Sequence, residues 1–169
     1  MIQFKHYSMS SDTIGTGDVV FKRYAATKSR FAQYVEGTLT ELFPEDFGNI
    51  TTLFSYTIID DALKRIEFPD TLETIESYNL SGNSLKEIIF SKNISLIYGG
   101  VCPTVAPGCI LDFSKAQKVP TAKTETSEGS SAEFFESSNI TSIKVPQKLY
   151  NTWKSANVWE KFASKIIAV

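Results

Sequence analysis

Two stretches of the chain share one pattern: residues 63–68 read Leu-Lys-Arg-Ile-Glu-Phe, and residues 85–90 read Leu-Lys-Glu-Ile-Ile-Phe. The Leu, Ile and Phe of the first stretch recur 22 residues later in the second. In an extended chain, side chains two positions apart point to the same face, so each Ile-x-Phe predicts a short strand with both residues buried. Pro69 follows the first strand and ends it, because proline cannot donate a ladder hydrogen bond.

The spacing of 22 residues extends beyond these two strands into the residues on either side. One such unit buries too little to hold itself, since a buried Leu, Ile or Phe contributes about 1.5–3 kcal/mol against about 1–2 kcal/mol of backbone entropy per ordered residue. Units that stack and share one core are therefore expected. The matching pairs are Ile50 and Leu72, Leu53 and Ile75, Tyr56 and Tyr78, Leu63 and Leu85, Ile66 and Ile88, Phe68 and Phe90, Leu72 and Ile94, and Ile75 and Ile97.

After these units the pattern becomes irregular. Residues 110–113 (Ile-Leu-Asp-Phe) predict a third strand, and residues 143–146 (Ile-Lys-Val-Pro) predict a fourth that again ends in proline. Between them, residues 121–131 are rich in Thr, Ser, Glu and Lys, which predicts a surface loop.

The C-terminal part has a different period. Leu149, Trp153 and Ala156 fall on one face of a short amphipathic helix. Trp159 and Phe162 follow, and residues 165–169 predict a final short strand. The two tryptophans are expected to cover the open end of the stack, with a ligand-stacking platform as the alternative.

The first 36 residues do not show the repeat. Val20, Tyr24, Phe31 and Tyr34 are compatible with a helix, whereas residues 19–21 (Val-Val-Phe) are equally compatible with the start of a strand. This segment is either a cap or an arm that docks on another subunit.

The sequence as a whole predicts an α+β fold, a short irregular solenoid of about four stacked short strands with a helix-containing cap. The expected divisions are an N-terminal anchoring or capping segment at residues 1–36, the solenoid at residues 37–146, and a C-terminal helix and strand cap at residues 147–169.

Composition narrows the class of protein. The 169 residues carry a net charge of −2, so no basic stripe is available to neutralise nucleic-acid phosphates. No apolar run reaches the length that spans a bilayer, so no membrane insertion is expected. The start of the chain lacks the basic and apolar regions of a secretion signal, which leads us to expect a protein that is not secreted by the usual route.

Residues that carry chemistry are few. His6 is the single histidine, and without a second histidine or a Cys-x-x-Cys pair a zinc site is not expected. Cys102 and Cys109 are close enough in sequence for a disulfide, but without a secretion signal free thiols are the favoured interpretation. Gly15 and Gly17 lack the third glycine and the Lys-Ser/Thr of a nucleotide loop.

The acidic pairs are interpreted as solvated turns. No Ser lies in a Gly-x-Ser-x-Gly turn. The sequence therefore predicts no catalytic residue, no cofactor-binding residue and no metal ligand, and hence a protein that is not an enzyme; turnover that depends on His6 would argue against this. The pairs are Glu45 with Asp46 and Asp60 with Asp61.

Four Asn-x-Ser/Thr triplets begin at Asn49, Asn79, Asn93 and Asn139. Asn49 and Asn93 are two periods apart, and each precedes an apolar Ile. A role in a turn of the repeat explains these two better than glycosylation does.

The units at residues 63–75 and 85–97 resemble the BspA-like leucine-rich repeats of bacterial surface proteins. The closing stretch is similar to a C-terminal module of the same family that recurs in gut bacterial proteins and in their phages. Together the likeness covers roughly residues 37–169. It rests on Leu111-Asp112-Phe113-Ser114, Val119-Pro120-Thr121, Val145-Pro146, Leu149-Tyr150, Trp153-Lys154, Ala156-Asn157, Trp159 and Ala163-Ser164-Lys165-Ile166.

The chain also departs from this family. The usual Ala-Phe-x-x-Cys before each Leu is absent, and Ile59-Asp60 and Ser81-Gly82 stand near those places. Because of this departure, the side of each unit opposite the strand is expected to be less regular than in the family, whereas the strand ladder is unaffected.

The resemblance implies a short leucine-rich-repeat solenoid that binds other proteins or mediates adhesion without catalysis. Together with the chain length and the missing signal, it leads us to expect a phage virion structural protein, such as a head fibre, a capsid decoration or a tail accessory protein, assembled in the host cytoplasm. The expected partners are other virion proteins or the chain itself through residues 1–36, giving a homo-oligomer, with a host surface protein or glycan as a further partner. The alternative is an adhesion-type binding module on the bacterial cell surface.

Overall fold

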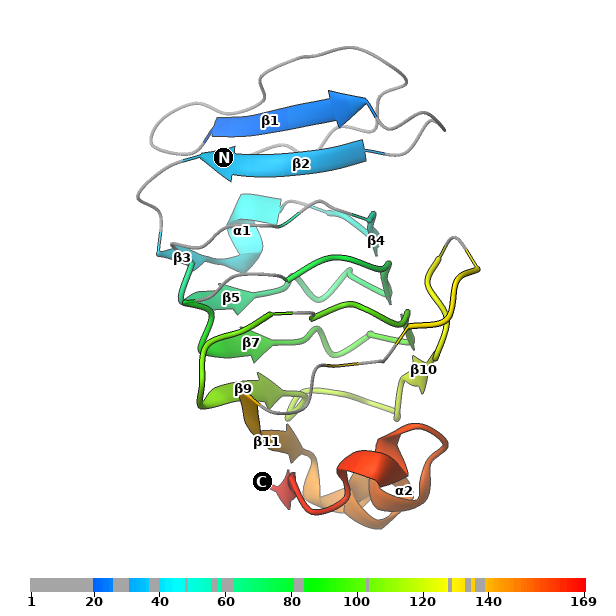
Figure 1. Cartoon of the computed structure of the whole chain (residues 1–169). Helices are drawn as coiled ribbons and strands as arrows, with labels where there is room; N and C mark the ends of the chain where they lie inside the picture. Colours follow the sequence, from blue (N-terminus) through cyan, green and yellow to red (C-terminus); the bar gives the residue numbers. More distant parts are fainter. Residues whose placement is uncertain are drawn as a thin grey trace.

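The computed structural model describes residues 20–25, 31–36, 40–47, 49–55, 58, 63–80, 84–102, 104–127, 129–132, 135 and 139–169. Two parallel sheets face each other across one core, and Figure 1 shows their strands in neighbouring layers. The larger sheet contains β3 (Glu41–Leu42), β5 (Arg65–Glu67), β7 (Glu87–Ile89), β9 (Cys109–Asp112), β11 (Ile140–Val145) and β12 (Ile166–Ala168). The smaller sheet contains β4 (Thr52–Leu53), β6 (Thr74–Ile75), β8 (Leu96–Ile97) and β10 (Thr121–Ala122).

From β3 to β10 the chain alternates between the two sheets, so that each turn of the chain adds one strand to each. Residues 22 apart in sequence are partners in neighbouring strands: Ile66 pairs with Ile88, and Ile75 pairs with Ile97. The next step is one residue longer, since Ile88 pairs with Leu111. The spacing read from the sequence is therefore the register of the parallel ladder.

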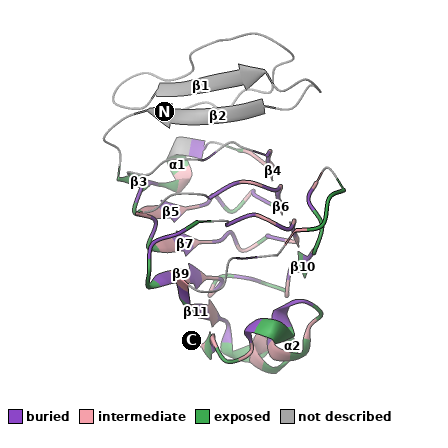
Figure 2. Ribbon diagram, viewed as in Figure 1, coloured by how far each residue is buried: buried purple, intermediate pink, exposed green. Residues whose placement is uncertain are grey.

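The apolar positions of both sheets point into the space between them and are buried. In Figure 2 buried residues recur along the strands of both sheets. Five aromatic side chains form a continuous column through this core, from the helix α1 (Pro44–Phe47) to the C-terminal end. Ring centroids are 5.2 Å apart for Phe47 and Phe68, 6.1 Å for Phe68 and Phe90, and 3.9 Å for Phe90 and Phe113. Phe113 then contacts Trp153 at 5.1 Å. Such pairs add to area burial because the rings interlock in favourable geometry.

The C-terminal segment covers the open end of this core. It consists of the 3-10 turn η2 (Gln147–Leu149), the helix α2 (Tyr150–Ser155) and the 3-10 turn η3 (Trp159–Phe162). Trp153 and Trp159 are both fully buried, and the indole N–H of Trp159 donates to the Pro120 carbonyl at 2.8 Å. The alternative of a ligand-stacking platform is wrong, because neither ring offers a face to a ligand.

In the N-terminal part, β1 (Val20–Ala25) and β2 (Phe31–Glu36) pair antiparallel with each other. The strand interpretation of residues 19–21 thus holds from Val20 onward, and the helical interpretation is wrong. Residues 1–19 lie outside the described residues.

The predicted fold class is wrong. In place of an α+β fold with about four stacked strands in a compact solenoid, the described residues form parallel sheets of six and four strands, an α/β-like parallel-sheet arrangement, and their helical segments are short. The prediction counted the two Ile-x-Phe strands and the strands at residues 110–113 and 143–146, all of which belong to the larger sheet. The smaller sheet is built of strands of two residues, too short to show an alternating pattern.

The predicted surface loop at residues 121–131 is also partly wrong. Thr121 and Ala122 form β10, the edge strand of the smaller sheet. Thr126 is almost fully buried.

The inward and outward positions of β7 give a direct stability test. Ile88→Asp puts a charge between neighbouring strands in the core, and we expect the free energy of unfolding to fall by about 4 kcal/mol or more. Ile89 is the next residue and points outward, so Ile89→Asn should cost less than about 1 kcal/mol. Urea denaturation of both variants checks this; equal losses would contradict the proposed facing of the strand.

Candidate binding surfaces

The outer face of the six-stranded sheet is fixed by the core. Because Ile66, Ile88 and Leu111 point inward, the residues on either side of each point outward. We call this surface the outer-face patch. It consists of Arg65, Glu67, Glu87, Ile89, Ile110, Asp112 and Lys144 from β5, β7, β9 and β11, with Lys115 from the turn after β9.

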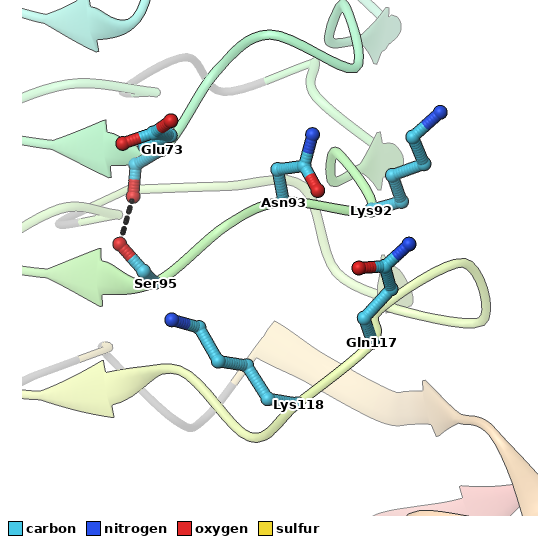
Figure 3. A pocket seen from close by; sticks show the side chains of 6 residues that line it. All are labelled: Glu73, Lys92, Asn93, Ser95, Gln117 and Lys118. Carbon is cyan, nitrogen blue, oxygen red and sulfur yellow. Dashed lines mark hydrogen bonds between the residues drawn. The ribbon is translucent and has the colours of Figure 1, made fainter.

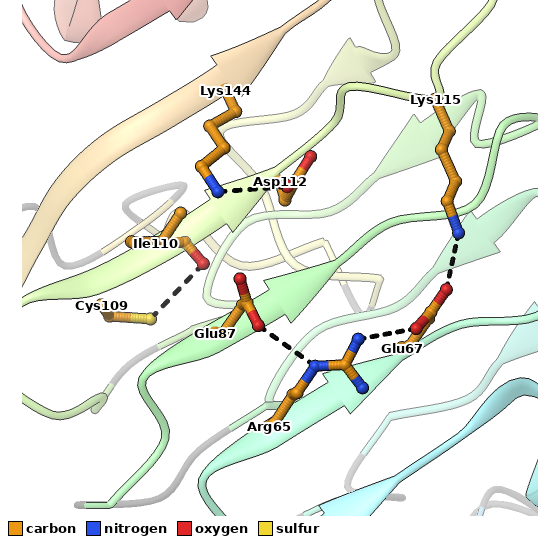
Figure 4. Close-up of polar contacts among 8 residues, drawn as sticks. All are labelled: Arg65, Glu67, Glu87, Cys109, Ile110, Asp112, Lys115 and Lys144. Atoms are coloured by element: carbon orange, nitrogen blue, oxygen red, sulfur yellow. Dashed lines mark hydrogen bonds and ion pairs between the residues drawn. The ribbon is translucent and has the colours of Figure 1, made fainter. Parts of the chain in front are cut away.

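The charged side chains of the patch are held by one another, as Figure 4 shows. Arg65 bridges two strands: its Nη2 lies 2.7 Å from Glu67 Oε2, and its Nε lies 3.1 Å from Glu87 Oε2. Lys115 Nζ lies 2.6 Å from Glu67 Oε1. Lys144 Nζ and Asp112 Oδ2 are 3.5 Å apart on neighbouring strands. Three cations and three anions cancel, so the patch is neutral.

These contacts shift two pKa values. The hydrogen bond from Lys115, and then that from Arg65, lower the pKa of the Glu67 carboxyl below its ordinary value, against a smaller opposing effect of burial. The hydrogen bond to Glu67 raises the pKa of the Arg65 guanidinium. Glu67 therefore stays ionised at any pH near neutrality, and its ion pairs persist.

Two partly exposed isoleucines lie in the middle of this charged surface. Ile89 is flanked in the sheet by Glu67 and Asp112, and Ile110 lies beside Glu87. Further apolar surface comes from Phe43, 39% exposed, over which the Arg65 guanidinium lies at 5.5 Å from the ring centroid. The patch thus has an apolar centre with a polar surround, which is the composition of protein interfaces.

A second surface lies where the chain turns from the larger sheet toward the smaller one. A pocket of about 430 Å³ opens there between the turns that lead to β6, β8 and β10 (Figure 3). We call it the corner pocket. It is lined by Glu73, Lys92, Asn93, Ser95, Gln117 and Lys118.

Part of the corner pocket is fixed by bonds to the previous turn of the chain. Asn93 Nδ2 donates to the Asp70 carbonyl at 2.8 Å, and Ser95 Oγ donates to the Glu73 carbonyl at 3.1 Å. Lys92 Nζ lies 2.9 Å from Asp70 Oδ2, and this hydrogen bond lowers the pKa of Asp70. These side chains are held in place before any ligand arrives.

The asparagines of the Asn-x-Ser/Thr triplets hold the layers together where the structure describes their side-chain bonds. Asn93 has the turn role expected of it. Asn79 is fully buried; its Nδ2 donates to the carbonyls of Phe54 and Glu76, and its Oδ1 accepts from the N–H of Ile58. Asn139 Nδ2 donates to the Val105 carbonyl at 2.9 Å.

The cysteines are free and buried, as the favoured interpretation expected. Burial raises the pKa of the Cys102 thiol well above its ordinary value, and raises that of Cys109 to about 12. Both thiols are therefore neutral near pH 7, and neither has the thiolate form that a nucleophile needs.

The other residues considered for chemistry are not brought together. His6, Gly15, Gly17, Asp60 and Asp61 lie outside the described residues, and Glu45 is exposed on α1. Within the described residues no group of three His, Cys, Asp or Glu side chains is placed to hold a metal ion. Nor does that part of the chain contain a helix whose length and apolarity would let it cross a bilayer.

Neither binding surface was identified from the sequence. A signal for the outer-face patch was present, because Arg65 and Glu87 are opposite charges one period apart and thus neighbours in a parallel ladder. The corner pocket had a signal of the same kind: Asp70 and Lys92 are opposite charges 22 residues apart, and the lining residues Glu73, Ser95 and Gln117 follow one another at the same spacing.

Comparison with known protein families finds no matching family model, and comparison with curated proteins finds no match either. The likeness to BspA-like repeats therefore stays a prediction from the residues.

The ion pairs of the patch predict a lowered pKa of the Glu67 carboxyl, which can be measured by titration. Because the folded-state pKa of Glu67 is lowered, its contacts stabilise the protein above the unfolded-state pKa, and this contribution is lost as the pH falls through the folded-state value. Lys115→Met should raise the pKa of Glu67 toward its ordinary value, as measured by carboxyl ¹³C NMR. Lys118→Met is the control and should leave it unchanged; an unchanged pKa in both variants would contradict the Lys115 contact.

Proposed function

We propose that the chain is a non-enzymatic binding module that recognises a protein partner through the outer-face patch. The observation that carries this proposal is the pair Ile89 and Ile110, two partly exposed apolar side chains set among ion pairs on the outer face of the parallel sheet. When a partner covers exposed apolar side chains of this kind, their removal from water lowers the free energy and stabilises the complex.

The ion pairs support this proposal in two ways. They hold Arg65, Glu67 and Lys115 in fixed positions, so that a partner orders fewer side chains when it binds. They also leave the patch neutral, which disfavours a polyanion such as nucleic acid and fits the mixed charges of a protein surface.

The finer proposal is that this module is part of a phage virion, as a head fibre, a capsid decoration or a tail accessory protein. Its support is the likeness of residues 111–166 to the C-terminal module described above, which also occurs in phage proteins. In this arrangement residues 1–36 anchor the protein or join its copies, and the outer-face patch is displayed.

The alternative is an adhesion-type module on the bacterial surface. The same patch serves it equally well, and the two functions differ in what residues 1–36 do. An anchor or oligomerisation segment belongs to the virion component, whereas a mere cap belongs to the free-standing module.

The mass of the protein in solution separates these two functions. We expect the full-length protein to form a trimer or a larger homo-oligomer, and a version starting at residue 37 to be a monomer, by light scattering coupled to size-exclusion chromatography. A monomer in both cases would contradict the virion proposal and favour the surface module.

The patch itself predicts the effect of removing its apolar centre. The double variant Ile89→Ser and Ile110→Ser should bind purified phage particles or bacterial envelope protein at least about tenfold more weakly than the wild type, since central apolar contacts carry most of the binding energy. Leu96→Ser, on the outer side of the smaller sheet, is the matched control. Equal binding by all three proteins would remove the patch as the contact surface.

A further inference from the structure

The corner pocket contains polar groups that the protein itself does not use. Within the described residues, the carboxylate of Glu73, the amide of Gln117 and the ammonium of Lys118 have no hydrogen-bond or ion-pair partner. All three are exposed. Their bonding capacity is therefore directed to solvent or to a ligand.

The unused groups face a wall whose position is fixed. The side chain of Asn93 donates to the Asp70 carbonyl, and the hydroxyl of Ser95 donates to the Glu73 carbonyl. The side-chain carbonyl oxygen of Asn93 and the lone pairs of the Ser95 hydroxyl remain as acceptors. Lys92 is held by Asp70, so its charge is already balanced. Figure 3 shows these side chains around one hollow, with Lys118 and Gln117 reaching in from the turn before β10.

The balance of charge decides what kind of ligand fits. Glu73 and Lys118 cancel, and Lys92 cancels Asp70, so neither a phosphate nor a simple cation finds a net opposite charge. What the pocket offers instead is both donors and acceptors: a carboxylate, two side-chain amides, a hydroxyl and the ammonium of Lys118. A sugar hydroxyl donates one hydrogen bond and accepts others, so a ring carrying several hydroxyls satisfies such a set.

We propose that the corner pocket binds a neutral sugar residue of a glycan. The Glu73 carboxylate accepts hydrogen bonds from sugar hydroxyls, and Lys118 and Gln117 donate to sugar oxygens. The volume of about 430 Å³ lies within the range of small-molecule pockets. This site is independent of the proposed protein contact, because it is built from the turns and not from the outer face of the sheet.

The expected affinity is low. Among the described residues no aromatic ring lines the pocket, so hydrogen bonds supply the binding free energy while the translational freedom of the ligand is lost. A single pocket should bind a monosaccharide with a Kd on the order of millimolar. Copies displayed together on an oligomer would bind a surface coated with glycans far more tightly, because later contacts become intramolecular.

The test uses the full-length protein and saturation-transfer NMR with glucose, galactose, mannose and N-acetylglucosamine. We expect at least one of them to bind, and Glu73→Gln and Lys118→Met each to weaken it about tenfold, since each removes a charge-assisted hydrogen bond. Glu160→Gln and Lys161→Met are matched controls on the exposed surface of η3 and should bind as the wild type does. All four changes are at exposed positions, so each variant should keep its melting temperature.

Two results would overturn the proposal. One is the absence of binding by all four sugars at millimolar concentration, or binding that the two pocket variants leave intact. The other is binding of inorganic phosphate in place of sugars, lost on Lys118→Met and weakened steeply by salt, which would make the pocket an anion site. Neither result bears on the outer-face patch, because the Ile89 and Ile110 changes that test it as a contact surface leave Glu73 and Lys118 intact.

Discussion

The register of the parallel ladder is the constraint on which the rest of the structure depends. Ile66, Ile88 and Leu111 are partners in adjacent strands, and each is fully buried. A slip of one residue would turn all three to solvent and bring their charged neighbours into the core, at the cost of burying unpaired charges. Because the inward column is fixed, the outward column is fixed too. The charge pairs of the outer-face patch exist because Arg65 and Glu87 occupy the same position in successive strands.

The turns between the two sheets add a second constraint, which is polar. Short strands leave many backbone groups without a ladder partner, and buried side chains supply the missing bonds. Asn79 alone bonds three backbone groups, on residues 54, 58 and 76. Ser91 similarly donates to the Leu72 carbonyl in the layer before it. The polar residues of this chain thus hold neighbouring layers together much as the apolar column does.

How far the sequence predicts this structure follows from which signals repeat. The Ile-x-Phe strands, their register and their buried faces could be predicted. Apolar side chains that recur at a constant spacing are all buried at once when the strands stack in register. The smaller sheet could not, since strands as short as Thr74–Ile75 carry no alternation of their own. Its existence depends on the stacking of the longer strands, which forces the returning chain into a second ladder.

The segment around residues 121–131 shows the opposite error, in which composition suggested a solvated loop. Its polar side chains in fact bond polar groups of earlier layers: Ser127 N–H donates to Ser77 Oγ at 2.9 Å, and the hydroxyls of Ser55 and Ser127 are 2.8 Å apart. Composition does not reveal whether a serine forms its hydrogen bonds with water or with another serine. The backbone here also lies against Gly99, where a Cβ would come within 2.8 Å of the Ala132 carbonyl oxygen. A glycine at that position is what permits the close approach.

The outer-face patch depends on the register of the strands, and the corner pocket depends on the turns between the sheets. On the outer face the strands hold side chains in register, so opposite charges meet, neutralise each other and leave Ile89 and Ile110 as the groups that gain from a partner. At the corner the turn before β10 is longer than the turns before β6 and β8, and the three turns differ in sequence. Glu73 and Lys118 are not matched by neighbours there and keep their bonding capacity. A surface whose polar groups are already paired favours a broad apolar contact, as with a protein. A surface whose polar groups are unpaired favours a ligand that brings its own hydrogen bonds.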